Sequence, residues 1–294
     1  MKMLKYGLLV GLGMLLINSQ TLNFGVKAKQ PGRENNECMP DANKGGFHSL
    51  SATDDFHWQK RLASGRTVEI KGLHGNILAK AASGNEVEVT ATKRGRRGEV
   101  QDVDIKVLEH ENGVTICAVY PTIDPQQPYV CRSGNEQNNY GMVYFQNSDV
   151  QVDFTVRLPM GLRFIGRTVQ GEVEVTLLTN DIEAFTVNGD VRVSTAGHVR
   201  ATSMTGAITA SLKETSWVQP LELQTVNGDI IVALLSKTNA NVRAETSYGS
   251  IATDFPLNVQ KSSQQRSATG TIGGGGSDLM LKTVFGSIKL IRAP

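Results

Sequence analysis

Acidic residues recur at one position of a short pattern in the second half of the chain. The residue after a repeated glycine is Glu172, Asp190 or Asp229 in three copies, and His198 in another. Two carboxylates that converge in a cleft beside a base would suit hydrolysis of a glycosidic bond. In the series, however, Ala207 separates Asp190 from Asp229, and acids are common at exposed turns. We therefore expect turn residues here, with no catalytic residue.

The segment Gly273–Met280 matches the pattern Gly-Gly-x-Gly-x-Asp-x-apolar of calcium-binding β-helix repeats. Such a site needs tandem copies, because one turn completes the ion shell of the next, and the sequence holds one copy. The five histidines show no metal-ligand spacing, and no Gly-x-Ser-x-Gly motif accompanies them. The sequence predicts a glycine-rich corner, no metal site and no cofactor.

The N-terminus is typical of a secretory signal, because Met-Lys-Met-Leu-Lys precedes an apolar stretch from Tyr6 to Ile17. That stretch is too short to span a bilayer as a helix. We expect cleavage after Ala28 and export to the periplasm or the cell surface. The protein then meets an oxidising compartment, in which cysteines pair.

Cys117 and Cys131 are therefore predicted to form a disulfide, and two buried thiols are the alternative. Cys38 is left over, either free or able to bridge two chains. Lys93, Arg94, Arg96 and Arg97 form a basic cluster after a strand, which we place on a turn. This cluster is either a contact for an anionic surface polymer or a solvated hairpin tip. A net charge of +2 argues against a nucleic-acid partner.

Three aromatic residues, Trp217, Tyr248 and Phe285, are candidates for an exposed strip that contacts sugars, although burial is the commoner outcome for such residues. The segments that must position all these groups alternate apolar and polar residues, as in Thr67-Val-Glu-Ile-Lys and Val150-Gln-Val-Asp-Phe-Thr-Val. Period-two alternation predicts half-buried strands. The chain therefore belongs to the all-β class.

The second half repeats the pattern Ser/Thr-x-x-Gly-x-Ile/Val. Each unit has the length of one strand and one turn, and glycine supplies positive φ at the corner. Stacked units would share one core, which predicts a β-solenoid-like fold with a strand-rich N-terminal cap. An antiparallel meander is the alternative, because Asn-Gly pairs favour hairpins. The repeated corner glycines are Gly171, Gly189, Gly197, Gly206, Gly228, Gly249, Gly270 and Gly286.

Four copies, Thr186-Val-Asn-Gly-Asp-Val, Thr225-Val-Asn-Gly-Asp-Ile, Thr246-Ser-Tyr-Gly-Ser-Ile and Thr283-Val-Phe-Gly-Ser-Ile, resemble the repeats of bacterial exported "putative adhesin" proteins. That family has a β-strand-repeat domain of unknown function. The resemblance covers about residues 56–294. It implies an all-β repeat fold, an extracytoplasmic location and no known catalytic activity, and it assigns no binding residue.

We therefore expect an exported, non-enzymatic scaffold of the cell envelope that contacts a surface or envelope polymer or a protein. The alternatives are a β-helical carbohydrate-active enzyme and a periplasmic sensory accessory protein. The expected organisation is a signal peptide at 1–28, a flexible lead-in at 29–55, a β-rich cap region with the disulfide loop at 56–165, and the strand repeat at 166–294.

Overall fold

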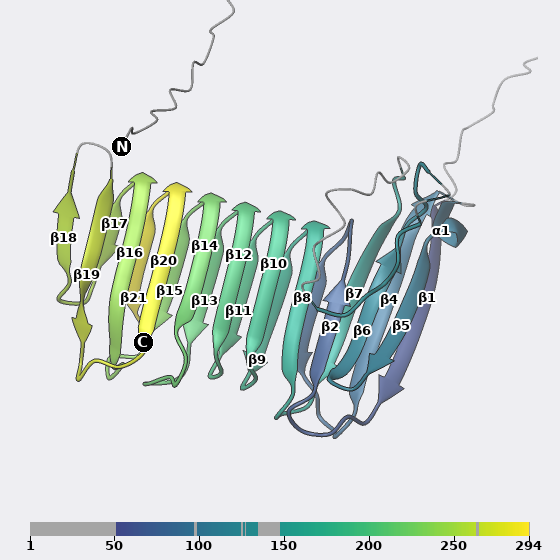
Figure 1. Cartoon of the computed structure of the whole chain (residues 1–294), viewed down its shortest axis with the longest axis horizontal. Helices are drawn as coiled ribbons and strands as arrows, with labels where there is room; N and C mark the ends of the chain where they lie inside the picture. The colour runs from purple at the N-terminus through teal and green to yellow at the C-terminus, as the bar shows by residue number, and fades with distance from the viewer. Residues whose placement is uncertain are drawn as a thin grey trace, which may run out of the picture. The chain divides into compact units, whose positions relative to one another are not determined.

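The computed structural model describes residues 51–96, 99–124, 126, 128–134, 148–262 and 265–293. These residues form two stacked β-sheets, with the short helix α1 (Glu99–Asp102) at one end (Figure 1). The first sheet contains, in spatial order, β1 (Ser51–Lys60), β4 (Val87–Arg96), β7 (Gln151–Leu158), β3 (Ile77–Ala81), β9 (Val173–Leu178), β11 (Val191–Thr195), β13 (Ile208–Leu212), β15 (Ile230–Leu234), β21 (Ile288–Arg292) and β17 (Ile251–Thr253).

The second sheet faces the first across the core. Among the described residues, no helix is long and apolar enough to cross a membrane. The second sheet contains, in spatial order, β18 (Asn258–Lys261), β19 (Arg266–Ile272), β16 (Ala240–Tyr248), β20 (Asp278–Phe285), β14 (Leu221–Asn227), β12 (Val199–Thr205), β10 (Ile182–Asn188), β8 (Arg163–Gln170), β2 (Thr67–Lys71), β6 (Gly113–Val119) and β5 (Asp104–His110).

The strands of the repeat form parallel coils. The chain passes from a strand of one sheet to a strand of the other at each corner, and β10 pairs in parallel with both β8 and β12. Asn188-Gly189 and Asn227-Gly228 join strands of opposite sheets, so they are not hairpin turns. The predicted β-solenoid-like fold is confirmed for these coils, and the antiparallel meander is wrong.

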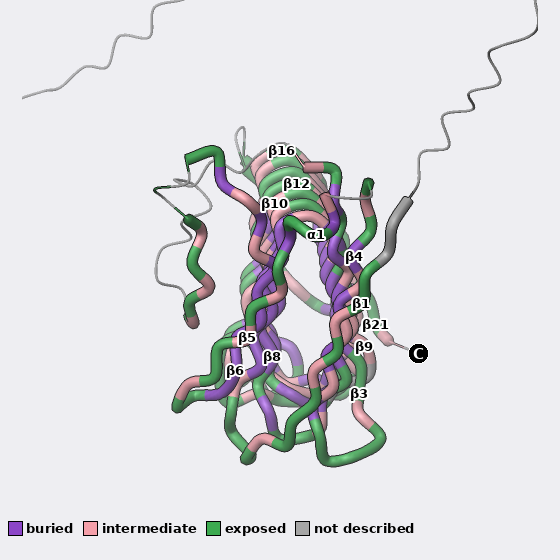
Figure 2. The backbone as a smooth tube through the Cα atoms, turned by 90° about the vertical axis from the view of Figure 1, so that its right-hand side faces the viewer, coloured by how far each residue is buried: buried purple, intermediate pink, exposed green. Residues whose placement is uncertain are grey.

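One continuous core runs between the two sheets (Figure 2). In β11 the burial alternates strictly, and Val191 lies in register with Ile208 of β13. Ile208 in turn pairs with Ile230, and Ile230 with Ile288, all without solvent exposure. Each coil thus adds aliphatic side chains to a stack that no single coil could bury alone.

The spatial order of the coils departs from the sequence at both ends. The last coil of the sequence, β20 and β21, lies between β14–β15 and β16–β17. At the other end, β2 and β3 pair directly with β8 and β9, so the stack of coils begins at Thr67. The coils therefore begin before residue 166, where the sequence predicts the start of the strand repeat. The expected lead-in at 29–55 overlaps a strand, because residues 51–55 belong to β1 and pair with β4.

Candidate interaction surface

A chain of hydroxyl hydrogen bonds holds the corners of successive coils together. Thr186 Oγ1 donates to the carbonyl oxygen of Gly171 at 2.8 Å, and Ser203 Oγ to that of Gly189 at 3.0 Å. The same bond recurs in the later coils, from Thr225, Thr283 and Thr246 to Gly206, Gly228 and Gly286. The serine or threonine of the repeat is buried, so its hydroxyl is satisfied within the protein by the glycine carbonyl of the neighbouring coil.

The corner glycines are required mainly because the coils approach each other closely. A Cβ on Gly189 would lie 2.0 Å from the carbonyl oxygen of Gly171, and its φ is +156°. Gly228 and Gly286 have no positive φ in the left-handed range, yet a Cβ there would meet a carbonyl oxygen at 2.0 and 1.9 Å. Positive φ therefore explains only part of the repeat. Gly270 is not at a corner, because it lies inside β19.

Two of the three acids after the corner glycines accept hydrogen bonds from the backbone of the neighbouring coil, whereas the third, Glu172, pairs with Arg192. Asp190 Oδ1 accepts from the amide of Ala207 at 2.9 Å, and Asp229 Oδ1 from that of Ser287 at 2.7 Å. Asp190 also pairs with Arg192 at 2.9 Å. These carboxylates therefore act as corner caps, as the sequence predicted for turn residues.

The residue before each of five corner glycines forms an exposed line, which we call the corner row: Asn188, Thr205, Asn227, Phe285 and Tyr248. Strand pairing puts neighbouring members opposite each other. The row follows the ends of β10, β12, β14, β20 and β16, at the upper edge of Figure 1. With strands about 4.8 Å apart, the row spans roughly 19 Å.

The two aromatic members of the corner row are exposed and stacked. Tyr248 is 67% exposed and Phe285 is 52% exposed. Their ring centroids are 4.9 Å apart with an interplanar angle of 7°. Burial, the commoner outcome for such residues, is therefore not what happens to these two.

The polar members of the corner row have unused hydrogen-bonding groups. Within the described residues, the side chains of Asn188, Thr205 and Asn227 make no hydrogen bond, and all three are exposed. Met204 and Val226, each one residue earlier in its coil, add exposed apolar surface beside the row, at 49% and 39%. The row therefore offers amide and hydroxyl groups, aliphatic surface and a ring platform, without a charge of its own.

Trp217 does not belong to this row. It lies in the connection between β13 and β14, at the opposite ends of the second-sheet strands from the row. Its side chain is partly buried against the core. There it lines a pocket of about 310 Å³ with Asp181 and His198. The imidazole of His198 is already within 2.6 Å of the carbonyl oxygen of Pro220. The predicted strip of three aromatic residues is thus reduced to a pair.

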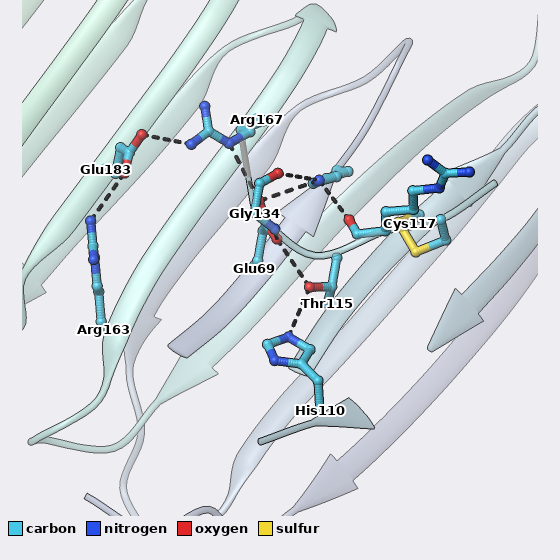
Figure 3. Close-up of polar contacts among 11 residues, drawn as sticks. Glu69, His110, Thr115, Cys117, Gly134, Arg163, Arg167 and Glu183 are labelled. Atoms are coloured by element: carbon cyan, nitrogen blue, oxygen red, sulfur yellow. Dashed lines mark hydrogen bonds and ion pairs between the residues drawn. A yellow bond between two sulfur atoms is a disulfide. The ribbon is translucent and has the colours of Figure 1, made fainter. Parts of the chain in front are cut away.

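A second polar group, which we call the buried ion cluster, comprises Glu69, Lys71, Arg167 and Glu183, which are linked by ion pairs. Figure 3 labels Glu69, Arg167 and Glu183. Glu69 is only 2% exposed. Its carboxylate accepts from Thr115 Oγ1 at 3.0 Å and from Arg167 Nε at 3.4 Å. Arg167 also pairs with Glu183 at 2.6 Å. These bonds join four neighbouring strands, β6, β2, β8 and β10.

The disulfide loop covers this cluster. Lys71 Nζ donates to the carbonyl oxygens of Arg132 at 2.6 Å and Gly134 at 2.9 Å, and the amide of Gly134 donates to Glu69 at 3.0 Å. Cys117, which pairs in register with Lys71, holds the loop through its disulfide to Cys131. The predicted disulfide is confirmed. Burial lowers the pKa of Lys71, and the charge of Arg167 acts in the same direction.

The predicted basic cluster is not a free patch. Lys93, Arg94 and Arg96 lie in β4 and not on a turn. Lys93 is buried and pairs with Asp54 at 2.5 Å, Arg94 pairs with Asp153 at 2.9 Å, and Arg96 with Asp149 at 3.1 Å. Arg97 lies outside the described residues. The acids come from β1 (Asp54), from β7 (Asp153) and from the residues just before β7 (Asp149), and their approach to β4 is not evident from the sequence.

The glycine-rich segment at 273–276 makes the turn from β19 to β20, which lie on either side of β16. It wraps around Asn239 and Asn241: Asn239 Oδ1 accepts from the amide of Gly274 at 2.7 Å, and Asn241 Nδ2 donates to Gly276 at 2.7 Å. Over the part of the chain that the structure describes, no three His, Cys, Asp or Glu side chains are grouped to hold a metal ion. The expected signal peptide and Cys38 lie outside the described residues.

The fold is thus that of an all-β, β-solenoid-like repeat protein. Residues 167–291 match the model of the family described as Toastrack DUF4097. The predicted resemblance to a strand-repeat family of unknown function is confirmed over these residues, which include every coil from β9 to β21 except part of the last strand. The match is shorter than the 56–294 that the resemblance covered.

Several solved structures are similar to the chain. A "putative cell adhesion protein" from Clostridium sporogenes ATCC 15579 is 12% identical with a TM-score of 0.40, over 82% of this chain and 100% of that one. A "putative adhesin" from Bacteroides fragilis NCTC 9343 is 14% identical with a TM-score of 0.30, over 81% and 97%. A "putative lipid binding protein" from Parabacteroides distasonis ATCC 8503 is 10% identical with a TM-score of 0.22, over 84% and 98%. No curated protein matches the sequence.

Proposed function

We propose that this protein is an exported, non-enzymatic β-repeat protein of the bacterial cell envelope that binds surface or envelope material through the corner row. The observation that carries the proposal is the row itself. Five exposed side chains from five neighbouring coils lie in register, three with free hydrogen-bonding groups and two as a stacked ring pair. The rigid stack of coils fixes the spacing of these groups before a partner binds, which lowers the entropy cost of binding.

Two features support export to the periplasm or the cell surface. The basic and apolar N-terminal stretch is typical of a secretory signal. The Cys117–Cys131 disulfide is typical of proteins in oxidising compartments. A reducing cytoplasm would open this bond and release the loop that covers the buried ion cluster.

A role without catalysis is supported by how the acids are used. Asp190 and Asp229, the acids that a glycosidase would need, are engaged with backbone amides of the next coil. Glu69 is held by threonine, arginine and a backbone amide beneath the disulfide loop, and Glu183 is held by Arg163 and Arg167. Each of these carboxylates has a structural task, and none of the four lies in the corner row.

The proposal is tested by measuring how the purified exported chain binds to isolated envelopes of the cells that produce it. The double variant Tyr248→Ala, Phe285→Ala is expected to lose about tenfold in affinity, which corresponds to about 1.4 kcal/mol. The matched control is Val259→Ala with Ile291→Ala, two exposed apolar residues outside the row at 47% and 40% exposure. This control is expected to bind within twofold of the native chain, roughly 0.4 kcal/mol. Equal binding by the native chain and the row variant would contradict the proposal.

A further inference from the structure

The carbonyl oxygens of all five members of the corner row accept hydrogen bonds from amides of neighbouring coils, which leaves the side chains as the main groups that a partner can recognise. The amide of Gly206 donates to the carbonyl oxygen of Asn227 at 2.9 Å, and the amide of Gly228 to that of Phe285 at 2.9 Å. Gly286 donates in the same way to Tyr248 at 3.0 Å. A polypeptide that adds a strand needs free backbone acceptors as well as donors, and the carbonyl oxygens of the row are already engaged. The row therefore favours a ligand whose hydroxyl groups and apolar faces contact the side chains of the row.

The charge around the row argues against a polyanion. No lysine or arginine occupies the row, the position before each member or the position after each of its glycines. The charged residues at those positions are Asp190, which is paired with Arg192, and Asp229, which is exposed and has no ion pair among the described residues. Like charges in this setting disfavour an acidic polymer, and a neutral polymer meets no such repulsion.

The side chains of the row match the surfaces of a sugar ring. The exposed amides of Asn188 and Asn227 can both donate to and accept from hydroxyl groups. Stacking occupies one face of each aromatic ring, and exposures of 67% and 52% leave the remaining ring surface of Tyr248 and Phe285 accessible to the C–H face of a pyranose. Met204 adds apolar surface beside Thr205.

The spacing of the row suits a polymer that lies along the coil axis. Successive members are one strand spacing apart, about 4.8 Å, which is close to the length of one sugar residue in an extended chain. The same kind of contact can therefore repeat from coil to coil.

From these observations, and resting on the proposed function of the corner row, we propose that the ligand is a neutral, linear polysaccharide of the envelope or of a contacted surface. It lies along the row, with its hydroxyl groups on Asn188, Thr205 and Asn227 and a sugar face on the Phe285–Tyr248 platform. No bond is made or broken in this interaction.

The test uses envelope carbohydrate as competitor. Envelopes are digested exhaustively with protease, and the released carbohydrate is separated on an anion exchanger into a neutral fraction and an anionic fraction. Each fraction, and the undigested protein extract, then competes with immobilised envelopes for the purified exported chain. The neutral fraction is expected to compete, with little change when salt is raised, and the double variant Tyr248→Ala, Phe285→Ala is expected to need about ten times more of it.

Asn227→Ala is expected to raise the required amount of neutral fraction about threefold, and Ile291→Ala, the control, to leave it within twofold of the native value. Competition by the anionic fraction alone, or by the protein extract alone, overturns the polysaccharide assignment and leaves the row as the binding surface. If no fraction competes while row variants still reduce envelope binding, the assignment also fails. Binding that row variants leave unchanged overturns the proposed function as well.

Discussion

The corner row and the buried ion cluster are both sets of polar side chains on the second sheet, and they are used in opposite ways. In the cluster, Glu69 and Lys71 are almost completely buried, and each has several partners. In the row, Asn188 and Asn227 are exposed and have no side-chain partner within the described residues. Outward-facing polar residues of the second sheet thus bind the disulfide loop at the buried ion cluster, and they form a contact surface at the corner row.

The difference is set by what covers the outer face. The loop held by Cys131 lies over β2, removes water from the cluster and leaves protein groups as the partners of its charges. No described segment covers the ends of β14, β20 and β16 in this way, as the exposures of Phe285 and Tyr248 show. Covered polar groups must be satisfied within the protein, whereas uncovered ones remain available for a partner.

The largest effect is expected from Glu69→Ala, because it leaves Lys71 and Arg167 buried without their shared carboxylate. Breaking one partner of a buried ion pair costs about 3–5 kcal/mol, which urea denaturation would measure. The control is Glu109→Gln in the exposed Lys60–Glu109 pair, where both side chains are about half exposed and about 0–1 kcal/mol is expected. A cost for Glu69→Ala as small as that of the control would mean that the loop does not seal the cluster.

The next effect is expected from removing the disulfide with Cys117→Ser and Cys131→Ser together. Opening a loop of about 15 residues lowers the free energy of unfolding by roughly 3 kcal/mol in the chain-entropy model. Thermal unfolding should show the same loss when the native chain is reduced with a thiol, and no further loss when the double variant is reduced. A reductant effect on the double variant would point to another cause.

A smaller effect is expected from Thr225→Val, which removes the hydroxyl that donates to the carbonyl oxygen of Gly206. The carbonyl then lacks one partner, and a cost of about 1–2 kcal/mol follows. Thr209→Val is the control, because Thr209 lies exposed on the first sheet, and its expected change is within about 0.5 kcal/mol. Equal stability of the two variants would show that the hydroxyl chain does not hold the corners.

The smallest effect on stability is expected within the corner row. Asn227→Ala removes no intramolecular hydrogen bond of the described residues, so the unfolding free energy should stay within about 0.5 kcal/mol of the native value. Binding to envelopes should nevertheless fall. Urea denaturation and envelope binding on the same preparation separate the two effects. A loss of stability above that range would mean that Asn227 stabilises the fold, and the contrast between a structural ion cluster and a binding row would no longer hold for this residue.

Much of the fold could be predicted from the sequence. Alternation in Val191–Thr195 and the spacing of the repeated glycines are local signals, and both survive in the structure as strands and corners. The insertion of β20–β21 before β16–β17 could not be predicted. All coils present similar aliphatic residues to each other, so the preferred neighbour depends on the fit of whole coils and on the turn at Gly273–Gly276.

The two polar sites were harder to predict from the sequence than the fold. The strand Thr67-Val-Glu-Ile-Lys has the pattern of a solvated outer face, and only the loop that Cys131 anchors turns Glu69 and Lys71 into buried groups. The corner row did leave a signal, because its members share the position before the repeated glycine. Their exposure depends on whether another segment of the chain covers the corner, and this cannot be predicted from the sequence.

The most direct test of the corner row is hydroxyl-radical footprinting of the native chain with and without envelope material. Met204, Phe285 and Tyr248 are exposed and carry reactive side chains, so each reports on the row without a mutation. We expect all three to become protected when envelope material is bound, while Val218 and Ile291, exposed at other places, keep their reactivity. Protection of Val218 or Ile291 with an unchanged row would contradict this expectation.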